Sequence, residues 1–126
     1  MNLLIFMIKI KRLFKSFKYA LKGLKKIFKE EQNFRVQSFI GVIVILLGIY
    51  FNINSIEWSI LVIIIILVLL MEIANSGVER IADVLQPRIN SYVKEIKDIM
   101  AAAVMVSSFG AIIVGIIIFL PYLFKN

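Results

Sequence analysis

The sequence predicts an all-α integral membrane protein with three transmembrane helices and an amphipathic surface helix at its N-terminus. Of the 126 residues, 61% are hydrophobic and the mean hydropathy is +0.95, more apolar surface than a soluble domain of this size can bury. Three apolar stretches each reach the roughly 17–25 residues that a helix needs to cross a bilayer. The basic residues concentrate at one end, where residues 1–30 hold nine of the fifteen Lys and Arg but only one acidic residue, Glu30.

Residues 1–30 predict the surface helix. With about 100° per residue, aromatic and aliphatic side chains gather on one face and most of the cations on the other, a pattern typical of helices that lie in the membrane interface. Tyr19 falls on the charged face, beside Arg12. The charge indicates contact with anionic lipid headgroups. No recognised nucleic-acid-binding fold accompanies it, so nucleic acid is not an expected partner.

The three apolar stretches define the expected spans, residues 36–53, 56–74 and 99–120. The third contains no charge and carries many small residues, which favour close helix packing in membranes. Between the last two spans, residues 76–98 are expected to form a polar helix extension, ended by Pro87 and Arg88, and a loop with a short amphipathic piece from Ser91 to Asp98. With no internal repeat or linker, residues 1–126 form one expected membrane domain.

The basic N-terminal segment predicts the orientation, because positive charge favours the cytoplasmic side. With three spans, the N-terminus is then cytoplasmic and the C-terminus external. Glu31, the segment from Glu72 to Asp83, and the adjacent residues Lys97 and Asp98 all fall on the cytoplasmic side, where nucleotides are found.

Composition limits the chemistry. The chain has no Cys and no His, which excludes disulfides, thiol chemistry, the usual zinc sites and acid–base catalysis by histidine. A bound metal would be a hard, oxygen-liganded ion, which indicates Mg²⁺. A membrane protein this short encloses no large polar cavity by itself, so sites between subunits of a homo-oligomer are expected.

The strongest functional signal lies at the end of the second span, in the segment Met71–Asp83. On a helix, four polar residues share a stripe about 80° wide: Glu72, Asn75, Glu79 and Asp83. Ahead of Glu72, the segment Trp58–Met71 has a single polar residue, Ser59. A carboxylate at the edge of the hydrocarbon is costly and usually marks ion, proton or substrate chemistry. The alternative is an amphipathic helix whose acids simply face water.

These residues suit phosphoryl transfer, which requires carboxylates for metal, cations for phosphate and a group that orients or deprotonates the attacking hydroxyl. No GxxxxGK[ST] or GxGxxG motif is present. Glu31 and Glu79 can share metal ions, and the cations expected to meet phosphates are Arg12, Lys94 and Lys97. Glu72 is the candidate general base for an interfacial alcohol, and Asn75, one turn away, is placed to orient it.

Four segments resemble the small prokaryotic diacylglycerol kinase family, which includes the undecaprenol kinases. EIANSGVERIAD, from Glu72 to Asp83, is similar to the family signature E-x-x-N-[ST]-x-x-E-x-x-x-D. The other three are YALKGL at Tyr19, EQNFR at Glu31 and KDIMAAAV at Lys97. Their order and spacing are retained, and the resemblance covers roughly residues 12 to 120.

The resemblance implies a domain-swapped homotrimer in the bacterial plasma membrane, with composite active sites, Mg·ATP as phosphoryl donor and a lipid alcohol as acceptor. It makes Glu72 the catalytic base and Asn75 its active-site neighbour, and Glu31 and Glu79 the metal ligands. The positions that contact or organise the nucleotide are Arg12, Tyr19, Glu31, Glu79, Lys97 and Asp98, and Asp83 ends the signature. Overall similarity is nearer to the undecaprenol kinase branch.

Three other functions remain open. A diacylglycerol kinase would make phosphatidic acid with the same machinery. A small proton-coupled exporter would use the deep Glu72 but would not need Asn75, Glu79 and Asp83 with it. A structural or pore-forming membrane peptide would need only the basic amphipathic helix.

Overall fold

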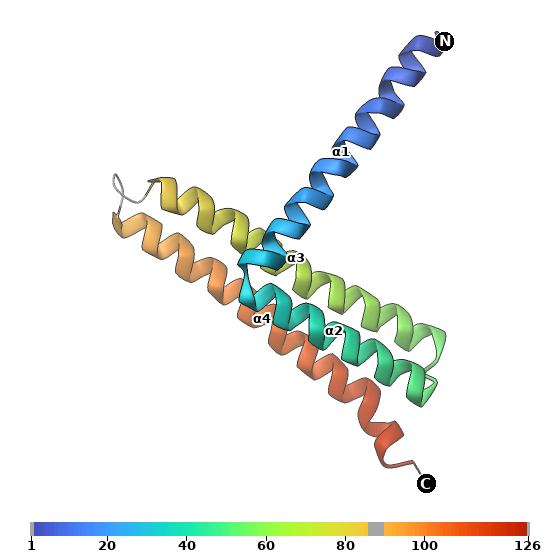
Figure 1. Ribbon diagram of the computed structural model, residues 1–126. Coiled ribbons are helices and arrows are strands. Elements are labelled where there is room, and N and C mark those ends of the chain that lie inside the picture. Colours follow the sequence, from blue (N-terminus) through green and yellow to red (C-terminus); the bar gives the residue numbers. More distant parts are fainter. Residues whose placement is uncertain (1, 86–89, 126) are drawn as a thin grey trace. The chain divides into compact units, whose positions relative to one another are not determined.

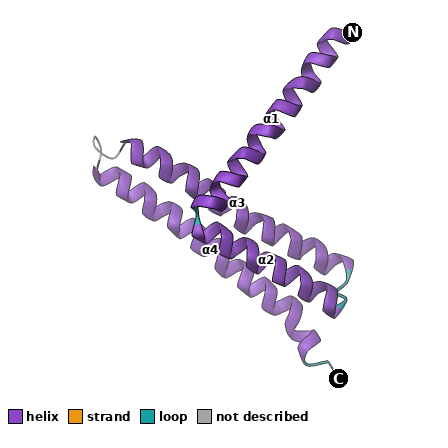
Figure 2. Ribbon diagram, in the orientation of Figure 1, coloured by secondary structure: helices purple, strands orange, loops and turns teal. Residues whose placement is uncertain are grey.

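A computed structural model describes residues 2–85 and 90–125, which form four helices: α1 (Leu3–Glu30), α2 (Gln32–Phe51), α3 (Ser55–Leu85) and α4 (Asn90–Leu123) (Figure 1). Figure 2 shows helices joined by short loops throughout this part of the chain. The chain divides into two units, residues 1–32 and 33–126, which are described separately. Pro87 and Arg88, expected to end the second long helix, lie outside the described residues.

The first unit is α1. None of its 28 residues is buried, and its large apolar side chains other than Ile27 are exposed along the helix. The helix ends at Glu30 and is capped by Glu31, whose backbone is extended (φ −108°, ψ 109°) and whose N–H donates to the Ile27 carbonyl at 2.8 Å. Because α2 begins at the next residue, Gln32, the break between the two helices is confined to Glu31.

The second unit starts with an α2–α3 hairpin whose turn is closed by backbone hydrogen bonds. Asn52 adopts a left-handed conformation with φ 52°, which Asn tolerates better than most residues. The Asn52 N–H donates to the Ile49 carbonyl and the Ile53 N–H to the Gly48 carbonyl, both at 3.2 Å. This is a Schellman motif, and it satisfies two carbonyls at the end of α2.

A reciprocal cap begins α3. The Asn54 side chain accepts a hydrogen bond from the Glu57 N–H at 2.8 Å, and the Glu57 carboxylate accepts one from the Asn54 N–H at 3.2 Å. The two bonds satisfy donors that a helix N-terminus otherwise leaves unpaired. Glu57 also accepts a hydrogen bond from the Tyr122 hydroxyl, which ties the end of α4 to the start of α3.

The best-packed part of the second unit lies next to this turn. Ile53, Leu61 and Ile118 form its buried cluster, with aromatic side chains packed around them. Gly48 lets the Trp58 ring approach, since a Cβ at Gly48 would lie only 2.7 Å from the ring. The hairpin turn is therefore the anchored end of the unit.

The three helices of the second unit run in alternating directions (Figure 1), and all three are long and apolar enough to cross a membrane. At 1.5 Å per residue, the 31 residues of α3 and the 34 of α4 extend over about 46 and 51 Å. The hydrocarbon core is only about 30 Å thick. Both helices therefore continue beyond it, and α4 is one helix from Asn90 onward, without a separate piece before the span.

Candidate active site

The polar stripe lies on the second half of α3, which stays helical from the apolar segment through to Leu85. The segment contains no proline and a single glycine, Gly77, so nothing in it breaks the helix. Glu72 is 6% exposed and Ser76 is 2% exposed, whereas Asp83 is exposed. The stripe thus runs from a buried carboxylate to an exposed one.

In the structure, the polar residues of this half of α3 form two adjacent rows, and within each row successive residues are four positions apart. One row consists of Asn75, Glu79 and Asp83. The Asn75 side-chain amide donates to the Glu79 carboxylate at 3.4 Å, a long contact that orients this half-buried carboxylate. Both residues were expected in the site, and the structure brings them together.

The same row is tied to α4 by an ion pair. The Lys97 ammonium lies 2.6 Å from the Asp83 carboxylate and donates a hydrogen bond to it. The sequence placed both residues in the site but did not pair them, because they are fourteen positions apart. Asp98, the next residue on α4, is exposed.

The second row consists of Glu72, Ser76 and Arg80. Arg80 was not a candidate, yet its guanidinium donates to the Ser76 hydroxyl at 2.5 Å and to the Ser76 carbonyl at 3.4 Å. Residues four apart on a helix are neighbours, so the spacing of Ser76 and Arg80 within the signature was the signal from which their contact could have been predicted. A half-buried cation therefore lies on the same helix as the three carboxylates.

The remaining candidates belong to the first unit. Arg12 and Tyr19 are exposed on α1, with 63% of Tyr19 accessible. Glu31 is half-buried at the break that ends α1. Two of these residues therefore lie on the surface of one amphipathic helix, and the third lies at its end.

The donor set suits Mg²⁺ bound together with a nucleotide. No three acidic side chains converge on one point within residues 2–85 and 90–125. Such a closed cage is not what Mg²⁺ requires, because it usually binds one or two carboxylates together with waters and substrate phosphates. Glu79, with its carboxylate oriented by Asn75, fits that role.

Comparison with known proteins identifies the family. A sequence profile described as "Prokaryotic diacylglycerol kinase" matches residues 18–119. The chain belongs to this prokaryotic diacylglycerol kinase family. It is therefore an ATP-dependent lipid kinase and a multi-pass membrane protein.

Individual relatives have two different names. An undecaprenol kinase of Bacillus subtilis strain 168 is 31% identical over 90% of this chain and 93% of its own length. A diacylglycerol kinase of Synechocystis is 32% identical over 84% of this chain, which spans only 61% of that protein. A diacylglycerol kinase of Escherichia coli K12 is 26% identical over 81% and 84%.

The kinase profile includes most of the candidate residues. Its match covers Tyr19, Glu31, every residue of the two α3 rows, and Lys97 with Asp98, whereas Arg12 precedes it. Arg80 and Ser76, missed in the sequence, also fall inside the matched range.

Proposed function

We propose that this lipid kinase transfers the γ-phosphoryl group of Mg·ATP to undecaprenol, giving undecaprenyl phosphate and ADP. The observation that carries the proposal is the buried Glu72 carboxylate at the apolar end of a signature helix in a chain of this family. The similarity to the undecaprenol kinase of Bacillus subtilis, which extends over nearly the whole of both chains, supports the choice of acceptor.

Glu72 is the proposed general base. It takes the proton of the lipid hydroxyl as the hydroxyl oxygen forms a bond to the γ-phosphorus, while the bond from that phosphorus to the β–γ bridging oxygen breaks and ADP leaves. A base held at the edge of the hydrocarbon is within reach of an alcohol whose chain stays in the membrane. Asn75, one turn further on, positions the reacting groups and orients Glu79.

The nucleotide is proposed to lie on the polar side of Glu72. Glu31 and Glu79 bind Mg²⁺, and Arg12, Tyr19, Lys97 and Asp98 contact or organise ATP. When bound, Mg²⁺ neutralises the charge that develops on the transferring phosphates. The ion pair between Asp83 and Lys97 holds the exposed part of α3 against α4 for this contact, and the hydrogen bond from Asn75 orients the Glu79 carboxylate.

The assembly is proposed to be a domain-swapped homotrimer in the bacterial plasma membrane. The N-terminus and active sites are cytoplasmic and the C-terminus is external, an orientation favoured by nine basic residues near the N-terminus. Composite sites, to which neighbouring subunits contribute groups, are expected because a membrane protein of 126 residues encloses no large polar cavity by itself.

Diacylglycerol is the second candidate acceptor, giving phosphatidic acid by the same mechanism. It is favoured by the names of the Synechocystis and Escherichia coli relatives. A proton-coupled exporter remains the less favoured alternative, since only the depth of Glu72 supports it.

The deciding experiment is phosphate transfer from γ-labelled ATP by purified protein in mixed micelles. Undecaprenol and diacylglycerol are offered in parallel, with and without Mg²⁺. Magnesium-dependent label in undecaprenyl phosphate, at a higher kcat/KM than for diacylglycerol, is the expected result. Preference for diacylglycerol would retain the mechanism and change the substrate, and label in neither lipid would overturn the proposal.

A further inference from the structure

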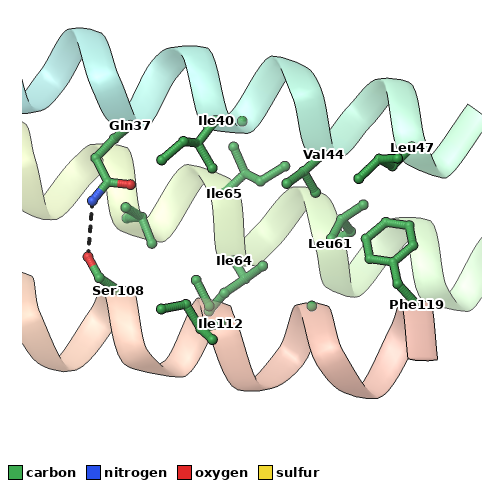
Figure 3. A pocket seen from close by; sticks show the side chains of 14 residues that line it. Gln37, Ile40, Val44, Leu47, Leu61, Ile64, Ile65, Ser108, Ile112 and Phe119 are labelled. Atoms are coloured by element: carbon green, nitrogen blue, oxygen red, sulfur yellow. Dashed lines mark hydrogen bonds between the residues drawn. The ribbon is translucent and has the colours of Figure 1, made fainter.

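The apolar part of the second unit ends one helical turn before Glu72. Figure 3 shows apolar side chains from α2, α3 and α4 lining a groove between these helices. Its two polar side chains, Gln37 and Ser108, are hydrogen-bonded to each other at 3.2 Å, from the Gln37 amide to the Ser108 hydroxyl. The last α3 residue in the lining is Val68, and the polar rows begin four residues later. A charged phosphoryl group is therefore expected beside these rows, because moving a charge into apolar surroundings is costly.

Arg80 extends back along α3 toward this boundary. Its Nη1 donates to the Ser76 hydroxyl at 2.5 Å and to the Ser76 carbonyl at 3.4 Å. Long side chains on a helix point toward its N-terminus, and these contacts bring the Arg80 guanidinium one turn back, to the buried Ser76. Because both acceptors on Ser76 are neutral, they hold the guanidinium in place without removing its charge.

The guanidinium lies at a level between the proposed base and the proposed metal ligand. At 1.5 Å per residue, Ser76 is about 6 Å beyond Glu72 and about 4.5 Å before Glu79 along α3. In the proposed reaction, Glu72 holds the attacking hydroxyl and Glu79 holds the phosphates through Mg²⁺, so the γ-phosphorus lies between these two levels. Lys97 is bonded to Asp83, about 16.5 Å beyond Glu72. Of these two cations, the guanidinium is therefore the nearer to the reacting group.

We propose that Arg80 is a catalytic residue of this kinase: its guanidinium, positioned by Ser76, donates hydrogen bonds to the γ-phosphoryl group during transfer. The inference rests on the proposed function, because it adds a charge-stabilising group to that reaction. As the bond to the attacking oxygen forms and the bond to the bridging oxygen breaks, negative charge is spread over the oxygens of the transferring group. A planar guanidinium matches phosphate oxygens with paired N–H donors, which the ammonium of a lysine does not provide.

The alternative is that Arg80 only anchors α3 at the edge of the membrane, as long basic side chains commonly do. Kinetics with Mg·ATP and undecaprenol in mixed micelles, or diacylglycerol if the wild type prefers it, distinguish the two roles. Arg80→Met should lower kcat about 10²–10³-fold, the usual cost of removing one donor that stabilises charge in the transition state. Arg80→Lys, which retains the charge but not the paired donors, should recover only part of this loss. Lys125→Met, at the far end of the chain, should behave like the wild type.

Nucleotide binding separates a loss of catalysis from a loss of folding. ADP has no γ-phosphoryl group, so its dissociation constant in the presence of Mg²⁺, measured by isothermal titration calorimetry, should be the same for Arg80→Met and the wild type. A variant that binds ADP normally but has a low kcat is defective in phosphoryl transfer. Loss of ADP binding together with kcat would overturn the inference, because Arg80 would then hold the helix or the nucleotide as a whole.

Ser76→Ala tests how the guanidinium is positioned. It removes the hydroxyl acceptor from a buried position and leaves a side chain of similar size. Ser76→Ala should lower kcat less than Arg80→Met, and the double variant should be no slower than Arg80→Met alone, since the two residues act as one unit. Ser59→Ala is the matched control. Ser59 also makes a hydrogen bond along α3, to the Ser55 carbonyl at 2.9 Å, but lies at the other end of the helix.

The outcomes keep the two proposals apart. If the wild type phosphorylates neither undecaprenol nor diacylglycerol, the proposed function fails and the inference fails with it. If it phosphorylates either lipid but Arg80→Met retains a near-normal kcat, the inference about Arg80 fails alone. Losses in kcat that add up in the double variant would also overturn the inference, because Ser76 would then not position the guanidinium.

Discussion

The ion pair between Lys97 and Asp83 has two possible roles, and the structure makes them separable. The two side chains are 34% and 63% exposed and their charges are 2.6 Å apart. Exposed pairs stabilise proteins by only about 0.2–1 kcal/mol. Losing a charge-assisted hydrogen bond to a nucleotide phosphate costs more, about 1.5–3 kcal/mol, which corresponds to roughly tenfold to 150-fold in kcat/KM.

Lys97→Met should therefore lower the free energy of unfolding by less than about 1 kcal/mol but raise KM for Mg·ATP by about tenfold or more. The charge-swapped double variant, Asp83→Lys with Lys97→Asp, should recover the stability and leave the kinase defect in place. Stability is measured by unfolding in detergent and activity by steady-state kinetics. Lys125→Met, a lysine replacement at the far end of the same chain, is the control.

Recovery of both stability and activity by the charge swap would refute the reasoning, because it would show that Lys97 acts only by holding α3 against α4. The same conclusion would follow if activity after Lys97→Met fell no further than the loss of folded protein.

The other predictions concern single positions. Glu72→Gln, which keeps the shape of the side chain, should reduce kcat by about 10²–10⁴-fold with ATP binding retained, and near-normal turnover would contradict the general-base role. Glu79→Gln should raise the Mg²⁺ concentration needed for half-maximal activity several-fold while leaving KM for the lipid unchanged; an unchanged Mg²⁺ requirement would remove Glu79 from the metal site. Gly48→Ala should lower the free energy of unfolding by about 1–3 kcal/mol, because its Cβ would lie 2.7 Å from the Trp58 ring. Gly110→Ala, with open space at the Cβ, is the control, and equal stability of the two variants would show that Trp58 simply moves aside.

Much of the fold could be predicted from sequence because its determinants are local. Apolar runs of membrane-spanning length and the helical spacing of Glu72, Asn75, Glu79 and Asp83 required only the geometry of one helix. The sequence analysis separated residues 91–98 from the third span because they are charged, whereas α4 runs through both without a break. Charge alone does not end a helix, and between Asn90 and Ile99 there is no Gly or Pro that would weaken or break it.

Contacts between helices could not be predicted in the same way. The Asp83–Lys97 pair and the Gln37–Ser108 hydrogen bond depend on how the helices are rotated about their axes, which a single sequence does not specify. Arg80 is a different case. Its contact with Ser76 lies within one helix, and it was overlooked because Arg80 occupies an unspecified position of the signature.

The length of α3 would let one helix serve both substrates of the proposed reaction, the lipid and the nucleotide. Taking Trp58 as the level of one membrane interface, a rise of 1.5 Å per residue places Glu72 about 21 Å along the helix, Glu79 about 32 Å and Asp83 about 38 Å. With a hydrocarbon core about 30 Å thick, a helix along the membrane normal would hold Glu72 toward the far edge of the core, Glu79 at its boundary and Asp83 beyond it.

This order matches what the two substrates of the proposed reaction require. A lipid hydroxyl needs a base at a depth that its chain can reach without leaving the membrane, whereas ATP and Mg²⁺ stay in water and need their ligands at or beyond the boundary. Because no loop interrupts α3, the spacing between these levels is fixed by helix geometry. Inserting one residue between Glu72 and Glu79 would rotate the two groups by about 100° as well as separate them, so the helix sets the depth and the direction of the site together.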